Sequence, residues 1–234
     1  MQLFEFLFPD VCPICLKPVI PKGGFLHEEC KGKLKFVARP FCLKCGRAIE
    51  DEAEEYCSSC RKTKFVFDAG RCTFVYHSDI GKAIKWVKEE GTRELVDFFG
   101  KATVKRHESF LRSFRADAIV PVPLTKGKQR ARGFNQAELF AESLSECLGI
   151  PVGRFLVKIK KTRDQKGLNR AERVQNLEGA FKACLPAEHM PGCVLLADDI
   201  YTTGSTVNAC AAALKNAGVD KVYFLCIAAG TSDV

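Results

Sequence analysis

Two adjacent carboxylates, Asp198 and Asp199, stand between an apolar run and a hydroxyl-rich loop. Residues 194–206 read Val-Leu-Leu-Ala-Asp-Asp-Ile-Tyr-Thr-Thr-Gly-Ser-Thr. The apolar residues predict a buried parallel strand, and a helix-like segment begins after Gly204. N–H groups in the first turn of a helix have no partner within the helix, and the helix dipole favours negative charge, so this layout predicts an anion-binding cradle.

The side chains around this cradle indicate what a ligand would carry. Asp198 and Asp199 can hold sugar hydroxyls or hydrated Mg²⁺. A sugar that bears both a phosphate and a pyrophosphate combines these features. The alternative is an ordinary strand, turn and helix start, but paired carboxylates at the end of a buried strand are costly without a partner. Hydroxyl donors would come from Thr202, Thr203, Ser205 and Thr206.

The same segment resembles the phosphoribosyl pyrophosphate (PRPP) motif of type I phosphoribosyltransferases, an apolar strand followed by two acidic residues and a Thr-Gly-x-Thr loop. The resemblance implies that Asp198 and Asp199 are catalytic and contact the ribose, that the loop holds the 5′-phosphate, and that Mg²⁺ accompanies PRPP. In relatives that salvage 6-oxopurines an Asp occupies the position of Thr202, which argues against hypoxanthine or guanine as the acceptor. The PRPP-binding residues implied are Asp198, Asp199, Ile200, Tyr201, Thr202, Thr203, Gly204, Ser205 and Thr206.

Two basic segments could neutralise the pyrophosphate. Residues 121–136 directly follow a predicted strand, where the loops of a doubly wound fold form the ligand crevice, and they supply Lys126, Arg130 and Arg132. Residues 154–173 hold eight basic residues against two acidic ones and predict a mobile loop with Lys160 and Arg163. Such a loop could close over a substrate and exclude water. The alternative is a nucleic-acid surface, since the same side chains neutralise backbone phosphates.

Cysteine pairs near the N-terminus have the spacing of metal ligands. Two Cys-x-x-Cys pairs predict a tetrahedral zinc site, and a third pair followed by His-x-x-Cys predicts a second site. The alternatives are free or redox-active cysteines, a surface position for the histidine, and ligand pairs that interleave between the two sites. Each set is closed, with four protein ligands, so the zinc is expected to be structural. The first predicted set is Cys42, Cys45, Cys57 and Cys60, and the second is Cys12, Cys15, His27 and Cys30.

The remaining cysteines do not suggest a disulfide framework. Thirteen cysteines are an odd number, and the Cys-x-x-Cys pairs are typical of metal binding in a cytosolic chain. The six outside the ligand sets lie in apolar surroundings and are expected to be buried thiols. They are Cys72, Cys147, Cys184, Cys193, Cys210 and Cys226.

Composition limits the classes of protein that the chain can be. The net charge of +8, from 36 basic and 28 acidic residues, favours polyanionic partners. No apolar run approaches the ~20 residues that span a bilayer. Residues 1–9 lack the basic region and cleavage site of a signal peptide, so we do not expect them to act as one.

Hydrophobic patterning divides the chain into two parts. Residues 1–65 have no long periodic segment and predict a small zinc-ribbon domain, whereas residues 66–234 alternate strand-like and helix-like runs that predict an α/β domain with a parallel sheet. The predicted strands are Arg71–Tyr76, Ala118–Val122, Val194–Ala197 and Val222–Ala228. The predicted helices are Ile80–Lys88, Arg93–Ser113, Asn135–Leu148 and Ser205–Asn216.

These segments together resemble the ComF family, proteins linked to DNA uptake in competent bacteria. The resemblance covers nearly the whole chain and implies a double zinc ribbon fused to a type I phosphoribosyltransferase fold, in which a sheet of mostly parallel strands is flanked by helices. It also implies a cytoplasmic location. Tyr76 and Lys88 fall where the family carries a Tyr and a Lys in its hood region, which adds both to the implied PRPP-binding residues. The residues that carry it, besides the zinc ligands and the PRPP motif, are Pro121–Leu124, Arg132–Gln136, Gln165, Leu168, Arg173, Asn176 and Gly179–Phe181.

Two functions from different classes follow. The chain could be a Mg²⁺-dependent phosphoribosyltransferase that acts on an unknown acceptor and serves competence and natural transformation. It could instead be a non-catalytic adaptor that senses PRPP or a nucleotide, binds single-stranded DNA and works with the DNA-uptake machinery. Acceptor-dependent release of pyrophosphate would favour the enzyme, and salt-sensitive DNA binding without turnover would favour the adaptor.

Overall fold

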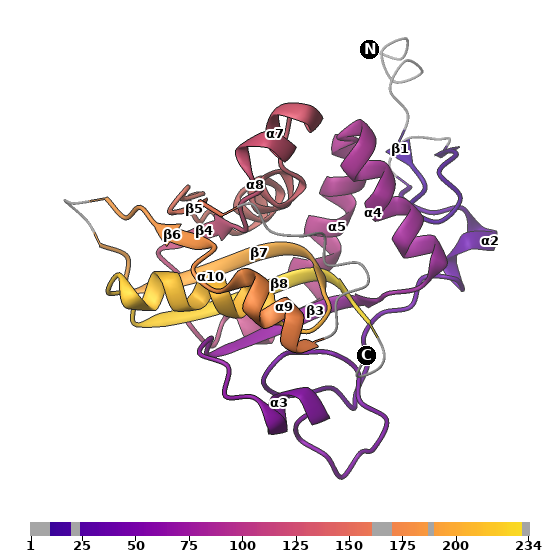
Figure 1. Cartoon of the computed structure of the whole chain (residues 1–234). Coiled ribbons are helices and arrows are strands. Elements are labelled where there is room, and N and C mark those ends of the chain that lie inside the picture. The colour runs from indigo at the N-terminus through magenta and orange to yellow at the C-terminus, as the bar shows by residue number, and fades with distance from the viewer. Residues whose placement is uncertain (1–9, 20–23, 161–169, 187–189, 231–234) are drawn as a thin grey trace.

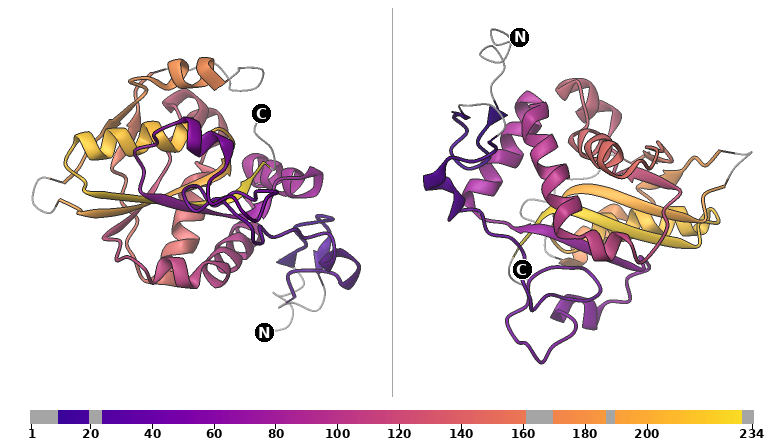
Figure 2. Two further views of the ribbon diagram at one scale, coloured as in Figure 1. Left: turned by 90° about the horizontal axis from the view of Figure 1, so that it is seen from below. Right: turned by 180° about the vertical axis from the view of Figure 1, so that it is seen from behind.

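A four-stranded parallel sheet forms the centre of the molecule. The computed structural model describes residues 10–19, 24–160, 170–186 and 190–230. Parallel neighbours need crossover connections, and these place helices on both faces of the sheet (Figures 1 and 2). The strands lie in the order β3 (Ala69–Val75), β8 (Lys221–Ala229), β7 (Cys193–Tyr201) and β4 (Ala118–Pro121), each parallel to the next.

Three helices cover one face of this sheet together with the first ribbon, the segment that carries the predicted ligands Cys12, Cys15, His27 and Cys30. Alternate residues of a strand point to opposite faces, and Leu195 and Ala197 of β7 point to this side, where they join a core that includes Ile84 and Phe140. The first ribbon adds Cys12 to the same core, so it is part of the packing rather than an appendage. The elements are α4 (Ser78–Glu90), α5 (Arg93–Arg106), α8 (Gln136–Leu148), β1 (Asp10–Val11), β2 (Pro18–Val19) and α2 (Glu28–Lys31).

The second ribbon is the segment that carries the predicted ligands Cys42, Cys45, Cys57 and Cys60, and it covers the opposite face together with the C-terminal helix. Val194 and Leu196 of β7 point to this side and share a core with Cys42 and Cys45 of the ribbon. In Figure 1 the second ribbon lies below the sheet, and the first lies beside α4 and α5. The elements on this side are α3 (Ser58–Lys62), α9 (Arg170–Leu177), α10 (Ser205–Asn216) and the antiparallel pair of β5 (Leu156–Lys158) and β6 (Phe181–Ala183).

The chain between the ribbons runs along the edge of the sheet. Val37 donates its N–H to Thr73 of β3 over 2.9 Å, and Val75 donates to Lys35 over 2.9 Å. Phe36 and Phe74 form the antiparallel bridge between these hydrogen bonds. This passage around the edge strand explains how one short N-terminal segment supplies a ribbon to each face.

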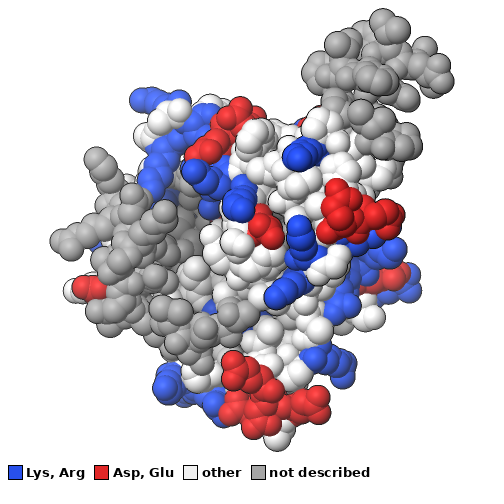
Figure 3. Space-filling model, turned by 90° about the vertical axis from the view of Figure 1, so that its right-hand side faces the viewer, with Lys and Arg blue, Asp and Glu red and all other residues white. Residues whose placement is uncertain are grey.

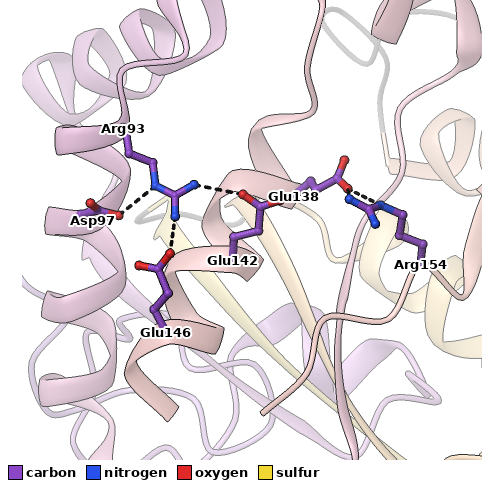
Figure 4. A network of polar contacts seen from close by, with 6 residues as sticks. All are labelled: Arg93, Asp97, Glu138, Glu142, Glu146 and Arg154. Carbon is purple, nitrogen blue, oxygen red and sulfur yellow. Dashed lines mark hydrogen bonds and ion pairs between the residues drawn. The ribbon is translucent and has the colours of Figure 1, made fainter. Parts of the chain in front are cut away.

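Helices α5 and α8 approach each other closely. A Cβ at Gly100 of α5 would collide with Ser143 of α8, so this crossing requires a residue without a side chain. Figure 4 shows Arg93 between the two helices, where it pairs with Asp97 of α5 and with Glu142 and Glu146 of α8. The side chains of these ion pairs are partly exposed, so water screens the pairs and they contribute little to stability. The apolar contacts and the close approach hold the two helices together.

The predicted fold class, a mostly parallel sheet flanked by helices with a zinc-binding ribbon at the N-terminal end, is confirmed. Three local expectations were wrong. The helix predicted for Arg93–Ser113 breaks at His107 into α5 and α6 (Glu108–Leu111). The basic segment after β4 forms α7 (Lys126–Arg132) rather than a loop, because Thr125 caps its start and Gly133, at φ 85°, ends it. The strands β5 and β6 were missed because three-residue strands carry no periodic signal.

None of the thirteen cysteines, all of which lie in the described residues, is joined in a disulfide. The expectation that six of them are buried was wrong for half. Cys72, Cys210 and Cys226 are buried, but Cys147 and Cys184 are exposed and Cys193 is half-buried. Cys147 stands in the last turn of α8 and Cys184 directly after β6, where the chain turns toward solvent. Among the helices of the described residues, none combines the length and apolarity that a bilayer-spanning helix needs.

Candidate functional site

The eight predicted zinc ligands lie together in two sets. In each set the candidate ligand atoms are all within 4.8 Å of one another. The Sγ atoms of Cys45 and Cys57 are 3.8 Å apart, which is about the S–S separation that a tetrahedral zinc with ~2.3 Å Zn–S bonds requires. The residues therefore fit the ion, and zinc would supply folding energy to two ribbons with little core of their own.

His27 has the geometry of a ligand in the first ribbon. Its Nδ1 lies 3.3 Å from Cys15 Sγ, and its Nε2 lies 3.1 Å from the carbonyl oxygen of Pro18. Donation from Nε2 to this carbonyl leaves the lone pair on Nδ1, the nitrogen that faces the thiols. A second hydrogen bond of this kind is usual for histidines that bind metals.

The acid pair lies within the C-terminal half of β7. Asp198 and Asp199 are each only 8% exposed. Asp198 Oδ1 accepts a hydrogen bond from the N–H of Asp199 over 2.9 Å, and Asp199 Oδ1 accepts one from Ile200 over 2.9 Å. Burial and the neighbouring Asp199 carboxylate raise the pKa of Asp198 well above its usual value of 3.8. The two buried carboxylates therefore repel each other, and a bound cation would reduce this repulsion.

Lys88 brings helix α4 to the acid pair. Its Nζ forms an ion pair with Asp199 Oδ2, and the two side chains are 28% and 11% exposed. The resemblance had assigned both residues to one site although 111 positions separate them, and the structure brings them together. One ammonium faces two carboxylates, so the pair keeps the capacity to bind further positive charge.

The hydroxyl-rich loop follows directly and ends at the start of α10. Gly204 has φ 79°, and Thr203 Oγ1 lies 2.8 Å from Ser205 Oγ. The N–H of Ser205 donates to Thr203 Oγ1 over 3.4 Å. Thr203 and Ser205 are buried, whereas Thr202 is exposed and Thr206 half-buried. The twelve residues of α10 direct a full helix dipole at this turn.

The basic helix α7 begins beyond the carboxyl end of β4, next to β7 in the sheet. Asn135 fixes this segment, because its Nδ2 donates to the carbonyl oxygen of Val122 over 3.0 Å and its Oδ1 accepts from Ala137 over 3.1 Å. Lys126 and Arg130 are exposed. Arg132 instead donates to Gln136, which turns it toward the start of α8.

A cavity of about 930 Å³ separates α7 from β5. Lys126 and Lys160, both predicted from the sequence, line it. Lys158 also lines it, and sequence reasoning missed this residue because a three-residue strand carries no periodic signal. The predicted Arg163 lies outside the described residues.

The other predicted site residues have different surroundings. Tyr76 follows β3 at the carboxyl edge and is exposed. Ile200 is half-buried and packs against the core that contains Leu195 and Ala197. Tyr201 is 1% exposed, and its ring stacks on Phe224 with centroids 5.2 Å apart. Its side chain therefore packs in the core next to the loop.

These features define a class of protein: a double zinc ribbon built into both faces of a parallel α/β domain, with an acid pair and a hydroxyl loop at the carboxyl edge of the sheet. Residues 3–61 match the family model described as double zinc ribbon domain. The chain is 31% identical over 214 residues to competence protein F of Haemophilus influenzae, covering 87% of this chain and 89% of that protein.

The chain belongs to the ComF family. It is also 27% identical over 202 residues to competence protein ComFC of Bacillus subtilis, covering 81% of this chain and 78% of that protein. A shorter match is to the DNA utilization protein YhgH of Escherichia coli, with 35% identity over 114 residues and about half of each chain covered.

Proposed function

We propose that the carboxyl edge of the sheet binds PRPP and that the protein transfers its phosphoribosyl group to an acceptor. The observation that supports this most strongly is the ion pair between Lys88 and Asp199 beside the turn at Gly204. It joins a cation, two carboxylates and a helix start in one place. A pentose that carries phosphate groups at both ends matches this order of charges.

The residues would divide the work by charge. Thr203, Ser205 and the first turn of α10 would bind the 5′-phosphate, and the lysines of the cavity beside α7 would neutralise the pyrophosphate. Asp198 and Asp199 would hold the ribose hydroxyls and stabilise the positive charge that develops on the sugar as the bond to pyrophosphate breaks. Their oxygens also suit Mg²⁺, which would supply charge neutralisation for the pyrophosphate when bound.

The names of the relatives suggest the process in which this activity is used. Two relatives are named competence proteins and one a DNA utilization protein. We propose that this chain likewise serves competence and DNA uptake. The zinc ribbons would stabilise the fold rather than take part in the chemistry, since each has four protein ligands.

A ligand series tests the proposal. PRPP with Mg²⁺ should raise the melting temperature of the protein, whereas glucose 6-phosphate, which lacks the pyrophosphate and the pentose, should raise it little. A ligand at about 100 times its Kd stabilises the folded state by about 2.7 kcal/mol. An acceptor screen that follows pyrophosphate release would then identify the reaction. Equal shifts with both sugar phosphates would contradict the assignment.

One observation favours the adaptor as a second candidate. A separate cavity of about 570 Å³ between the second ribbon and α6 is lined by Arg39, Arg71 and Arg106, together with the aromatic rings of Phe41 and Phe110. No carboxylate is among its lining residues in the described part of the chain. Arginines beside aromatic rings suit the phosphates and bases of single-stranded DNA.

The double substitution Asp198→Asn with Asp199→Asn separates the two candidates. It should abolish PRPP binding and leave affinity for a single-stranded oligonucleotide unchanged or slightly higher, because two negative charges are lost. Arg39→Gln with Arg106→Gln should do the reverse and reduce DNA affinity by about tenfold at low salt. Loss of both ligands in both variants would show that the two sites are not independent.

A further inference from the structure

Arg47 is a buried arginine of the second ribbon that contacts the candidate phosphate loop. It follows the zinc ligand Cys45 by two positions and is 3% exposed. Its Nη2 donates to the carbonyl oxygen of Thr202, and its guanidinium lies 5.3 Å from the ring centroid of Tyr201. A guanidinium is rarely buried to this extent, so the contacts to residues 201 and 202 must offset a considerable desolvation cost.

The zinc-binding turn determines where Arg47 points. The carbonyl oxygen of Cys42 accepts a hydrogen bond from the N–H of Gly46 over 2.8 Å. The N–H of Cys42 donates to the carbonyl oxygen of Arg47 over 2.8 Å. Gly46 has φ 70°, and a Cβ there would lie 2.5 Å from the Cα of Arg71 in β3. The N–H of Gly70 in β3 donates to the carbonyl oxygen of Lys44 over 2.8 Å. The turn is therefore held against β3, and from it the Arg47 side chain reaches residues 201 and 202 at the end of β7.

Further contacts connect the ribbon to both ends of the loop. A Cβ on Gly204 would lie 3.2 Å from the Phe65 ring. The N–H of Val66 donates to Asn208 Oδ1 in α10 over 2.8 Å. Thus Arg47 holds the residue before the turn, and the segment after α3 holds the helix that follows it.

We propose that the second zinc ribbon forms the rear wall of the phosphate cradle and that Arg47 is a positioning residue, which keeps residues 202–205 in the conformation that binds phosphate. This inference rests on the proposed function, because it assigns a support to the same site. Zinc with four thiolates carries a net negative charge, which would further stabilise the neighbouring guanidinium. The first ribbon packs against α5 on the other face of the sheet.

The test compares Arg47→Gln with Arg61→Gln. Arg61 belongs to the same ribbon and carries the same charge, but its side chain is 52% exposed and pairs with Glu54. Calorimetry with PRPP and Mg²⁺ should show about tenfold weaker binding for Arg47→Gln and unchanged binding for Arg61→Gln. Without ligand, the amides of residues 202–206 should exchange hydrogen faster in Arg47→Gln, while those of α5 and the zinc content remain as in the parent protein.

Hydrogen exchange separates a failure of this inference from a failure of the proposed function. Unchanged exchange at residues 202–206 in Arg47→Gln overturns the inference, whether or not the parent protein binds PRPP. Faster exchange in a protein that shows no PRPP binding supports the inference and contradicts only the ligand assignment. Should Arg47→Gln fail to fold, Arg47→Lys, which keeps the charge but loses the forked donor, is measured in the same way and is expected to show a smaller increase in exchange.

Discussion

At the scale of single residues, the acid pair of β7 is a stability cost that the free protein bears. Asp198 lies beside a second carboxylate in a buried strand, and Lys88 pairs with Asp199. Burial and the Asp199 charge raise the pKa of Asp198. Groups arranged in this way, against their own stability, are typical of ligand-binding sites.

The substitution Asp198→Asn should therefore stabilise the protein at neutral pH. The pKa of Asp198 is higher in the folded state than its usual 3.8, so the folded state binds more protons than the unfolded state and stability falls as pH rises above about 4. Asparagine removes this loss and can still accept the N–H of residue 199. We expect a melting temperature at least about 3 °C above that of the parent protein at pH 7.

Thermal melts of both proteins between pH 4 and pH 8 check this. The difference should shrink toward the acidic end, as the Asp198 carboxyl of the unfolded state also becomes protonated near its usual pKa of 3.8. A variant that is less stable than the parent protein at pH 7 would mean that the carboxylate is favourably paired in the free protein. Asp51→Asn, at an exposed position, is the control that removes the same charge.

At the scale of elements, β7, the turn and α10 act as one unit around Gly204. The residue has φ 79°, and a Cβ would overlap the Tyr201 hydroxyl and lie 2.9 Å from Cζ. Tyr201 cannot move aside because it is buried and stacked on Phe224. Backbone conformation and packing therefore both require glycine at this position.

Gly204→Ala should lower the free energy of unfolding by more than the roughly 1–2 kcal/mol that a left-handed backbone costs a residue with a side chain. Denaturant unfolding measures the loss. Tyr201→Phe removes the overlapping hydroxyl, so the double variant should lose less stability than the sum of the two single variants. Strictly additive losses would show that the two residues do not interact in the way the packing indicates.

The sequence predicted the elements with strong local signals and missed the contacts between distant segments. Residues Ser205–Asn216 were predicted as a helix with the observed bounds, because apolar spacing and the glycine before it coincide. The Cys and His spacings predicted both ligand sets. Arg47 gave no signal, since its role depends on a ribbon turn that meets β7 from a position 155 residues away.

At the scale of the whole molecule, the two ribbons lie against opposite faces of one sheet. Their cysteines belong to the same hydrophobic cores as the strands. Figure 3 shows basic side chains spread over the face that it presents and acidic ones in several groups, one of which lies at the lower end, where Figure 1 places the second ribbon. Glu50, Asp51, Glu52 and Glu55 are exposed there, so a bound polyanion is expected to avoid this tip.

Removal of zinc should destabilise the entire described structure and not the ribbons alone. Treatment with a strong chelator is expected to lower the melting temperature in a single cooperative transition, because each ribbon shares a core with the sheet. Calorimetric melting with and without chelator measures this. A second transition that stays at the original temperature would show that the α/β part folds independently of the ribbons.

Calorimetric titration with PRPP and Mg²⁺ tests the central claim most directly. The parent protein and Asp51→Asn should bind one equivalent of PRPP with matching affinity, and the double variant Asp198→Asn with Asp199→Asn should give no saturable heat. Equal binding curves for the parent protein and the double variant, or no binding to either, would contradict the assignment of a pentose phosphate site to the acid pair and its loop.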